Sequence, residues 1–353
     1  MKRIWRLLVP LFCLCLLLCG CSMMDGEYVS VTPNRPHGQN STEEEIMVSS
    51  YQQVQDVLSE MVESGVQDGV MYITNVSDIQ ATYFISTAIA YIRTENPIGV
   101  YAVNRITYEI GTNMGKRAIA VKITYNHNRS EILRIKQVRY MEEATDLVRV
   151  ALENYESSTV IKVKNYTDLD LVQFVEDYVS EHPDTCMEMP QVTVSFYPNF
   201  GYERVMEIFF TYQSGRDTLR LMQQSVSDVF MSARFYVDPH SENSEKFSHL
   251  YSFLMERYEY TIETSITPSY SLLRHGVGDS KAFASGYAAM CRQVGLTCEV
   301  ISGTKAGEAW HWNAIRDGDT VYHLDLLECK ASGYYTVKTE EEMTGYVWDY
   351  TNY

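Results

Sequence analysis

Residues 269–303 read SYSLLRHGVGDSKAFASGYAAMCRQVGLTCEVISG, followed by AWHWNAI at 309–315 and VYHLDLLEC at 321–329. A Ser or Asp directly before an apolar periodic run is typical of a helix N-cap, so a helix is expected to start at Asp279 or Ser280. The two later segments are rich in strand-forming residues and predict neighbouring strands. Together the three segments indicate an α+β core.

This pattern resembles the bacterial transglutaminase-like superfamily, which is related to papain-type cysteine peptidases. In that family a nucleophilic Cys opens the central helix fifteen residues before a glycine, and that place is Ser280 here. An H-x-W-N strand follows, with an Asp fifteen residues after its His. Trp312, Asn313 and Asp325 match this motif, but the His place is Trp310. The resemblance covers about the last third of the chain and implies a triad with two replaced members.

The replacements matter because a serine hydroxyl depends on a general base more than a thiol does. His311 follows the vacant His place, but successive side chains on a strand point to opposite faces. His311 is therefore expected to point away from Ser280. The alternative bases are His323, which shares the parity of Asp325, and His275, on the loop before Ser280. The plainer interpretation makes Ser280 a helix N-cap.

The N-terminus predicts export. Residues 1–20 combine a basic start with an apolar run from Leu7 to Leu18, which is typical of a signal peptide. The small residue before Cys21 resembles the lipobox of bacterial lipoproteins, in which Cys21 would carry fatty acyl chains such as palmitate. The expected location is the extracytoplasmic face of the cell membrane, anchored by this lipid. An uncleaved anchor is the alternative.

Composition and motifs limit the classes of partner, cofactor and metal that are expected. The formal net charge is −17, and it becomes −20 when the three basic residues of the signal peptide leave. This acidic balance argues against nucleic acid as a partner. No phosphate loop or dinucleotide fingerprint occurs, so no cofactor is expected. The spacing of the remaining cysteines does not match a zinc site, and no metal is expected. Four cysteines remain after the signal peptide and Cys21: Cys186, Cys291, Cys298 and Cys329. A disulfide between Cys298 and Cys329 is one possibility, and Cys291 is expected to be buried.

The region before the core is interpreted as an internal duplication. Two Thr-Tyr pairs ending at Tyr125 and Tyr212 lie eighty-seven residues apart, and similar strand and helix signals surround them in the same order. Each unit is predicted as β-α-β-β-α, with helix starts near Ser77 and Thr167. The predicted order is a signal peptide (1–20), a tether (21–41), an N-terminal helix (42–65), repeat 1 (66–150), repeat 2 (155–235) and the transglutaminase-like domain (243–353).

The favoured hypothesis is a lipoprotein whose transglutaminase-like domain is a pseudoenzyme, a binding or scaffold module for a peptide or cell-wall ligand. Trp312, Asn313 and Tyr322 are the candidate binding residues. The alternative is a serine-based hydrolase or acyltransferase using Ser280 and Asp325 with a non-standard His. A third is a structural envelope protein whose repeats carry the partner interface. An imidazole nitrogen within about 3.5 Å of the Ser280 hydroxyl would separate the first two.

Overall fold

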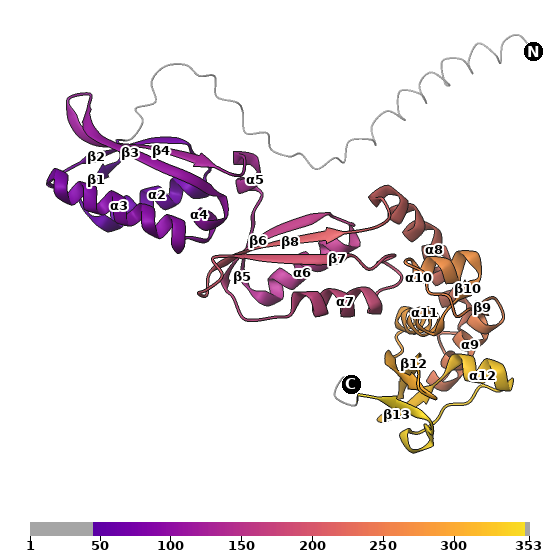
Figure 1. The fold of residues 1–353 in the computed structure, drawn as a ribbon. Helices are drawn as coiled ribbons and strands as arrows, with labels where there is room; N and C mark the ends of the chain where they lie inside the picture. Colours follow the sequence, from indigo (N-terminus) through magenta and orange to yellow (C-terminus); the bar gives the residue numbers. More distant parts are fainter. Residues whose placement is uncertain (1–44, 350–353) are drawn as a thin grey trace, which may run out of the picture. The chain divides into compact units, whose positions relative to one another are not determined.

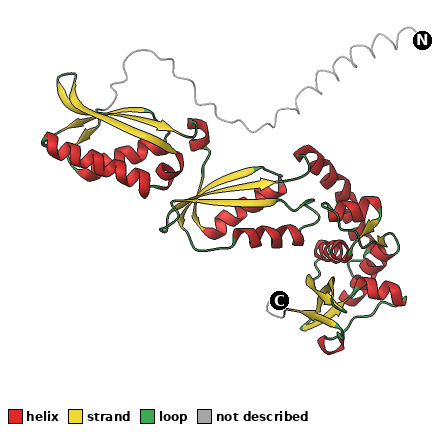
Figure 2. Ribbon diagram, in the orientation of Figure 1, coloured by secondary structure: helices red, strands yellow, loops and turns green. Residues whose placement is uncertain are grey.

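The structure is a computed structural model that describes residues 45–349 (Figure 1). The predicted signal peptide, the tether, Cys21 and the start of the predicted 42–65 helix lie outside these residues. The described chain is a mixed α and β fold with two sheet units and a C-terminal domain (Figure 2). No helix within the described residues is both long and apolar enough to cross a membrane.

The first sheet unit contains four strands with helices on one face (Figure 2). Its elements are β1 (Met47–Val48), α2 (Tyr51–Glu63), β2 (Asp68–Ile73), α3 (Asp78–Thr94), α4 (Pro97–Ala102), β3 (Val103–Asn113) and β4 (Lys116–Tyr125). The strand order is β1-β2-β4-β3, in which β1 is parallel to β2 and the other neighbours are antiparallel. The apolar stripes of α2 and α3 form one core with the sheet.

Side-chain caps set where these helices begin. Ser50 accepts from the amide of Gln53 and starts α2. The predicted helix over 42–65 therefore begins later, because the two residues of β1 pair with β2 instead. Ser77 caps α3 as predicted, and Gln80 completes a capping box with it.

The second sheet unit follows the short connecting helix α5. Its elements are α5 (Arg129–Leu133), β5 (Lys136–Tyr140), α6 (Met141–Glu153), β6 (Ser158–Asn165), α7 (Leu171–Glu181), β7 (Gln191–Tyr197) and β8 (Arg204–Thr211). The strand order is β5-β6-β8-β7, again with one parallel pair and two antiparallel pairs. Asp170 caps α7, so this helix starts after the predicted position at Thr167.

The two sheets share one topology. Ile119 of β4 pairs with Met71, and Met206 of β8, eighty-seven residues later, pairs with Ile161, ninety residues after Met71. The element order differs from the predicted β-α-β-β-α: each unit reads β-α-β-α-β-β, apart from the additional α4 in the first. The boundaries at 66–150 and 155–235 shift accordingly, because α6 packs with the second sheet. The duplication itself stays a prediction.

The C-terminal domain places a long central helix, α11, against a four-stranded antiparallel sheet. Its elements are α8 (Arg216–Tyr236), α9 (Asn243–Met255), β9 (Glu259–Tyr260), α10 (Pro268–Tyr270), the π-helix η1 (Ser271–His275), β10 (Val277–Gly278), α11 (Ser280–Gln293), β11 (Cys298–Lys305), β12 (Glu308–Asp317), β13 (Thr320–Leu324), α12 (Leu326–Ser332), the 3-10 helix η2 (Glu340–Glu342) and β14 (Tyr346–Trp348). The strand order is β13-β12-β11-β14.

The sheet has two differently packed faces. One face shares a core with α8, α9 and α11, to which the sheet contributes Ile315 and Leu324. On the other face Trp312 packs with Tyr346 and Trp348 of β14, the edge strand of the same sheet, and with Met343 just before it. These two faces separate the side chains that the sequence motif places next to one another.

Candidate functional site

Strand β12 sends alternate side chains to the two faces of the sheet. Asn313 donates to the carbonyl of Ala284 in α11 at 2.9 Å, so the face of β12 that carries Asn313 lies against the central helix. Trp312 and Ala314 belong to the cluster on the other face. By the two-residue period of a strand, His311 accompanies Asn313 and Trp310 accompanies Trp312.

The side chain of Ser280 contacts that of His311. Asp279 caps α11 by accepting from the amide of Ala282 at 2.9 Å, so Ser280 is the first helical residue and not the cap. The Ser280 Oγ lies 3.3 Å from Nδ1 of His311. The prediction that His311 points away from Ser280 is wrong. The alternation along the strand was applied correctly, but the face in contact with α11 is that of His311, not that of Trp310.

Burial lowers the pKa of His311 below its usual value of 6.5. The positive charge of Lys281 acts in the same direction, and the negative charge of Asp279 opposes it. The imidazole is therefore neutral at pH 7. A neutral ring has one nitrogen able to accept a proton.

Asp325 is engaged on the other face of the sheet. Its Oδ2 accepts from Nε1 of Trp310 at 2.9 Å and from Nζ of Lys305 at 2.7 Å, and the Tyr346 hydroxyl lies 2.6 Å away. Its Oδ1 accepts from two backbone amides and caps α12. The residue is only 5% exposed. The sequence motif thus joins Trp310 with Asp325, while Ser280 pairs with a different residue.

Glu328 extends this network. It accepts from Lys338 at 2.7 Å and from Lys305 at 3.4 Å, and it also contacts the Tyr346 hydroxyl. Burial alone would raise the pKa of Glu328, but the hydrogen bonds from Lys338 and Tyr346 and the charge of Lys305 lower it to about 2. Burial and the two carboxylates raise the pKa of Tyr346, which keeps its proton for donation. Two lysines and two carboxylates thus form one connected set of ion pairs.

The other candidate bases lie elsewhere. His323 is 2% exposed, and its Nδ1 accepts from Nε1 of Trp312 at 3.1 Å on the face away from α11. His275 ends η1 in an edge contact with Tyr270, with ring centroids 5.1 Å apart. Neither His323 nor His275 is the imidazole that contacts Ser280. An imidazole nitrogen does lie within the 3.5 Å that favours the serine-based alternative, but it belongs to His311, a residue that neither hypothesis named as the base.

The three residues predicted to bind ligand have structural roles. Trp312 and Asn313 are fully buried. Asn313 hydrogen bonds to the carbonyls of Ala284 and Glu299, which ties β12 to α11 and to β11. Tyr322 packs, partly buried, against the main core. Burial leaves Trp312 and Asn313 no surface for a ligand, whereas ligand contact by Tyr322 stays a prediction.

The cysteines are all free in the described chain. The possible disulfide between Cys298 and Cys329 is not formed. The Cys329 thiol donates to the carbonyl of Thr336 at 3.3 Å. Cys291 is buried as predicted, and burial raises the pKa of its thiol well above the usual value. Within residues 45–349 no group of three or more His, Cys, Asp or Glu side chains has the geometry of a metal site.

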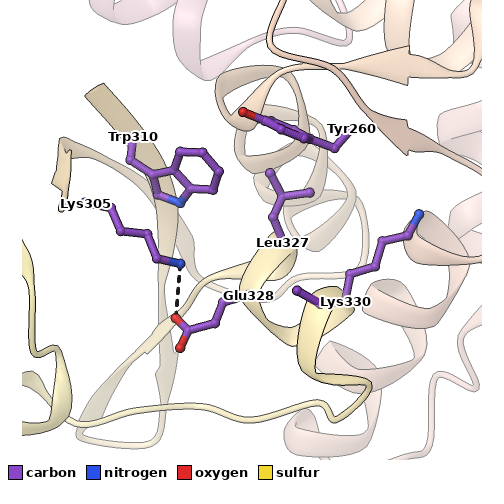
Figure 3. A pocket seen from close by; sticks show the side chains of 7 residues that line it. Tyr260, Lys305, Trp310, Leu327, Glu328 and Lys330 are labelled. Atoms are coloured by element: carbon purple, nitrogen blue, oxygen red, sulfur yellow. Dashed lines mark hydrogen bonds and ion pairs between the residues drawn. The ribbon is translucent and has the colours of Figure 1, made fainter. Parts of the chain in front are cut away.

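A cleft of about 400 Å³ opens beside Trp310 (Figure 3). It is lined by Tyr260, Lys305, Trp310, Leu327, Glu328, Lys330 and Ala331. The rings of Trp310 and Tyr260 lie 5.7 Å apart between centroids at an angle of 54°. Sequence reasoning missed Tyr260 and Lys305, which carry no motif. Tyr260 is placed by the pairing of β9 with β10, and Lys305 by the pairing of β11 with β12 and β14.

Comparison with known proteins agrees with this architecture. The family model of the transglutaminase-like superfamily matches residues 232–341, and this segment is a transglutaminase-like domain. No curated protein matches the chain in sequence.

Three solved structures are similar to parts of this chain. A TGase aligns at 10% sequence identity and a TM-score of 0.27, and the alignment covers 48% of this chain and 50% of the TGase chain. A proposed cysteine protease from Cytophaga hutchinsonii aligns with 11% identity, 44% and 73% coverage and a TM-score of 0.25. A proposed protease from Parabacteroides distasonis aligns with 11% identity, 60% and 47% coverage and a TM-score of 0.24. The chain thus spans about half the length of the TGase.

Proposed function

We propose that this protein is an extracytoplasmic binding module whose transglutaminase-like domain holds a peptide of the cell wall in the cleft beside Trp310, without the cysteine chemistry of its family. The observation that carries the proposal is the engagement of Asp325. Its carboxylate accepts from Lys305 and Trp310 and caps α12. No hydrogen bond from His311 to a carboxylate occurs among the described residues.

The chemistry of Trp310 supports a binding role. An indole supplies one N–H donor and no acceptor, so Trp310 cannot take a proton from a nucleophile. It can hold a fixed position, because its N–H is bonded to the buried Asp325. A triad in the family's arrangement needs an imidazole at this place. The aromatic wall that replaces it presents a flat apolar surface to the cleft.

The lining of the cleft combines apolar and aromatic surface with paired charges. Leu327 and Ala331 of α12 supply aliphatic surface, and Trp310 and Tyr260 supply ring faces. Lys305 is paired with Glu328, and Lys330 is paired with Glu259 at 3.1 Å, so the nearby charges are balanced. Aromatic rings with a polar edge bind aliphatic side chains and peptide groups, and ligand sites are commonly built in this way.

Replacing Trp310 by Ala should weaken binding of soluble peptide fragments from purified cell wall at least tenfold, about 1.4 kcal/mol. The reason is the loss of one aromatic wall of the cleft. Titration calorimetry on the full chain in detergent would measure the affinity. Tyr334→Ala is the matched control, because Tyr334 is an aromatic residue with 76% exposure that does not line the cleft. Equal affinities of Trp310→Ala and wild type would refute the cleft as the binding site.

The membrane anchor belongs to the same proposal and rests on the sequence around Cys21. Replacing Cys21 by Ala should abolish incorporation of an alkyne-labelled palmitate analogue and release the protein from the membrane fraction, because the acyl acceptor is lost. Cys19→Ala is the control, since Cys19 follows a leucine and is the poorer acceptor. Gel fluorescence of cells fed the analogue measures the outcome. Undiminished labelling of Cys21→Ala would exclude acylation at this position.

We further propose that the two sheet units are internal copies that serve as spacers or partner surfaces between the anchor and the transglutaminase-like domain. Their common strand order and the matching pairs at Ile119 and Met206 support this. Backbone superposition of the two sheets with their helices tests it, and helices on opposite faces would contradict it.

A further inference from the structure

We infer that Ser280 and His311 form an acyl-acceptor pair that reacts with small activated acyl esters, a chemical site separate from the binding cleft. The pair consists of the Ser280 hydroxyl, at the start of α11, and the imidazole of His311, 3.3 Å away. His311 lies on the face of β12 that packs against α11. The residues that line the cleft beside Trp310 include neither of them. The proposal goes beyond ligand binding, because it assigns a covalent step to this domain.

The Ser280 hydroxyl is available for this contact because a neighbour performs the capping. Asp279 satisfies the amide of Ala282, so the Ser280 Oγ turns toward the imidazole and not toward its own helix. Ser280 and Lys281 are the first two residues of α11, a helix of 14 residues. The first amides of a helix have no partner within the helix, and its dipole favours negative charge there. A developing oxyanion at this end is thereby stabilised.

His311 has the protonation state that a general base requires. Its Nδ1 faces the Ser280 hydroxyl and can accept the proton in the tautomer that carries hydrogen on Nε2. Two charged groups act on the ring: Lys281 favours the neutral form, and Asp279 favours the imidazolium that forms during reaction. Burial keeps the ring neutral at pH 7. A base in this position contributes roughly 10²- to 10⁴-fold to the rate of such a step.

The pair is independent of Asp325. That carboxylate lies with Trp310, Lys305 and Tyr346 in the network on the other face of β12. The replacement of the family's His by Trp310 therefore leaves the contact between Ser280 and His311 intact. Because the ring lacks an orienting carboxylate, turnover will be slow. Ser280 is 7% exposed, which limits the substrates to esters with small acyl groups.

The step is an ester cleavage by acyl transfer. Ser280 Oγ attacks the carbonyl carbon and forms a C–O bond while its proton passes to Nδ1 of His311. The tetrahedral oxyanion then collapses, the bond to the leaving alcohol breaks, and the imidazolium returns the proton to that alcohol. Water attacks the acyl-serine with His311 again as base, releasing the carboxylic acid and restoring the hydroxyl. Ester and water thus give acid and alcohol.

The test is covalent labelling of the full-length protein in detergent with a small fluorophosphonate, read by intact mass and by the labelled peptide. We expect one adduct on Ser280 and none in Ser280→Ala. His311→Gln should lower the labelling rate about 100-fold, because the base is lost while a hydrogen-bonding side chain remains. The wild-type rate should fall at acidic pH with a midpoint below 6.5, where His311 becomes protonated, and should be level above pH 7.

Matched variants keep the outcome clear. His240→Gln, on the exposed linker after α8, should label like wild type. Ser280→Cys provides a second measurement: beside His311 and at a helix N-terminus its thiol should react with iodoacetamide with an apparent pKa below about 8.5. Circular dichroism verifies that each variant is folded. Absence of an adduct on Ser280 in folded wild type, or equal rates in wild type and His311→Gln, would overturn the inference.

The outcome is distinguishable from that of the binding proposal. Two separate assays on the same wild-type protein measure them: calorimetry with the cell-wall peptide, and fluorophosphonate labelling of Ser280. Labelling of Ser280 without peptide binding would support the acyl-acceptor pair and contradict the proposed binding cleft. Peptide binding without labelling would support the binding cleft and contradict the acyl-acceptor pair.

Discussion

Replacing Asp325 by Ala should lower the free energy of unfolding of the C-terminal domain by about 3 kcal/mol, the low end for breaking a buried ion pair. The side chain of Asp325 is 3% exposed and holds both Lys305 and Trp310 while capping α12. Loss of the cap alone costs about 1 kcal/mol. Lys305 is 29% exposed and regains some hydration, which keeps the total near the lower limit. Urea unfolding followed by tryptophan fluorescence measures the difference.

Glu341→Ala is the control for this experiment. Glu341 is an exposed carboxylate in η2. Substitutions of this kind usually change stability by less than about 0.5 kcal/mol. If the Asp325→Ala variant is as stable as the Glu341→Ala variant, the network around Asp325 does not stabilise the fold. The hydrogen bond to Asp325 would then not explain why Trp310 keeps its position.

Trp312→Ala should destabilise the same domain by about 4 kcal/mol, as expected for truncating a buried tryptophan. Trp312 is fully buried between the rings of Tyr346 and Trp348, at 5.1 and 5.5 Å between centroids, and its N–H donates to His323. Truncation removes this packing and the hydrogen bond to His323. Since domains are stable by only about 5–15 kcal/mol, a large part of the margin is lost.

Trp310→Ala is the matched control for Trp312→Ala, because it removes the same side chain two residues earlier on the same face of β12. Trp310 is only partly buried, so its truncation leaves no closed cavity. We expect at most half the loss in stability, mainly from the hydrogen bond to Asp325. Thermal unfolding of both variants gives the comparison. A larger loss for Trp310→Ala would contradict the assignment of Trp312 to the core and of Trp310 to the cleft.

Local patterns in the sequence predicted much of the fold. The spacing from Ser280 to Gly295 marks a helix and the strand after it, and both are present as α11 and β11. Ser77 caps its helix as predicted, because an N-cap depends only on residues within one turn. Val54 and Leu58 are buried on one face of α2, as their helical spacing requires.

Longer-range pairing accounts for the misplaced elements. Ile132, Ile135 and Val138 have helical spacing and predict one helix. Instead Ile132 lies in α5, Ile135 in the connection after it and Val138 in β5, because β5 pairs in parallel with β6, more than twenty residues further along. A strand gains its hydrogen bonds from a distant partner, which an apolar spacing within one window cannot reveal.

The site shows the same division. From the sequence alone, β12 was predicted to send Trp310 and His311 to opposite faces, because alternation is a property of any strand. Which of those faces meets α11 depends on packing between elements, and a shift of one residue exchanges the two sets of side chains. Only the tertiary structure placed His311 on Ser280 and Trp310 on Asp325. The sequence determined which residues could react, and the contact of β12 with α11 decided which of them meet.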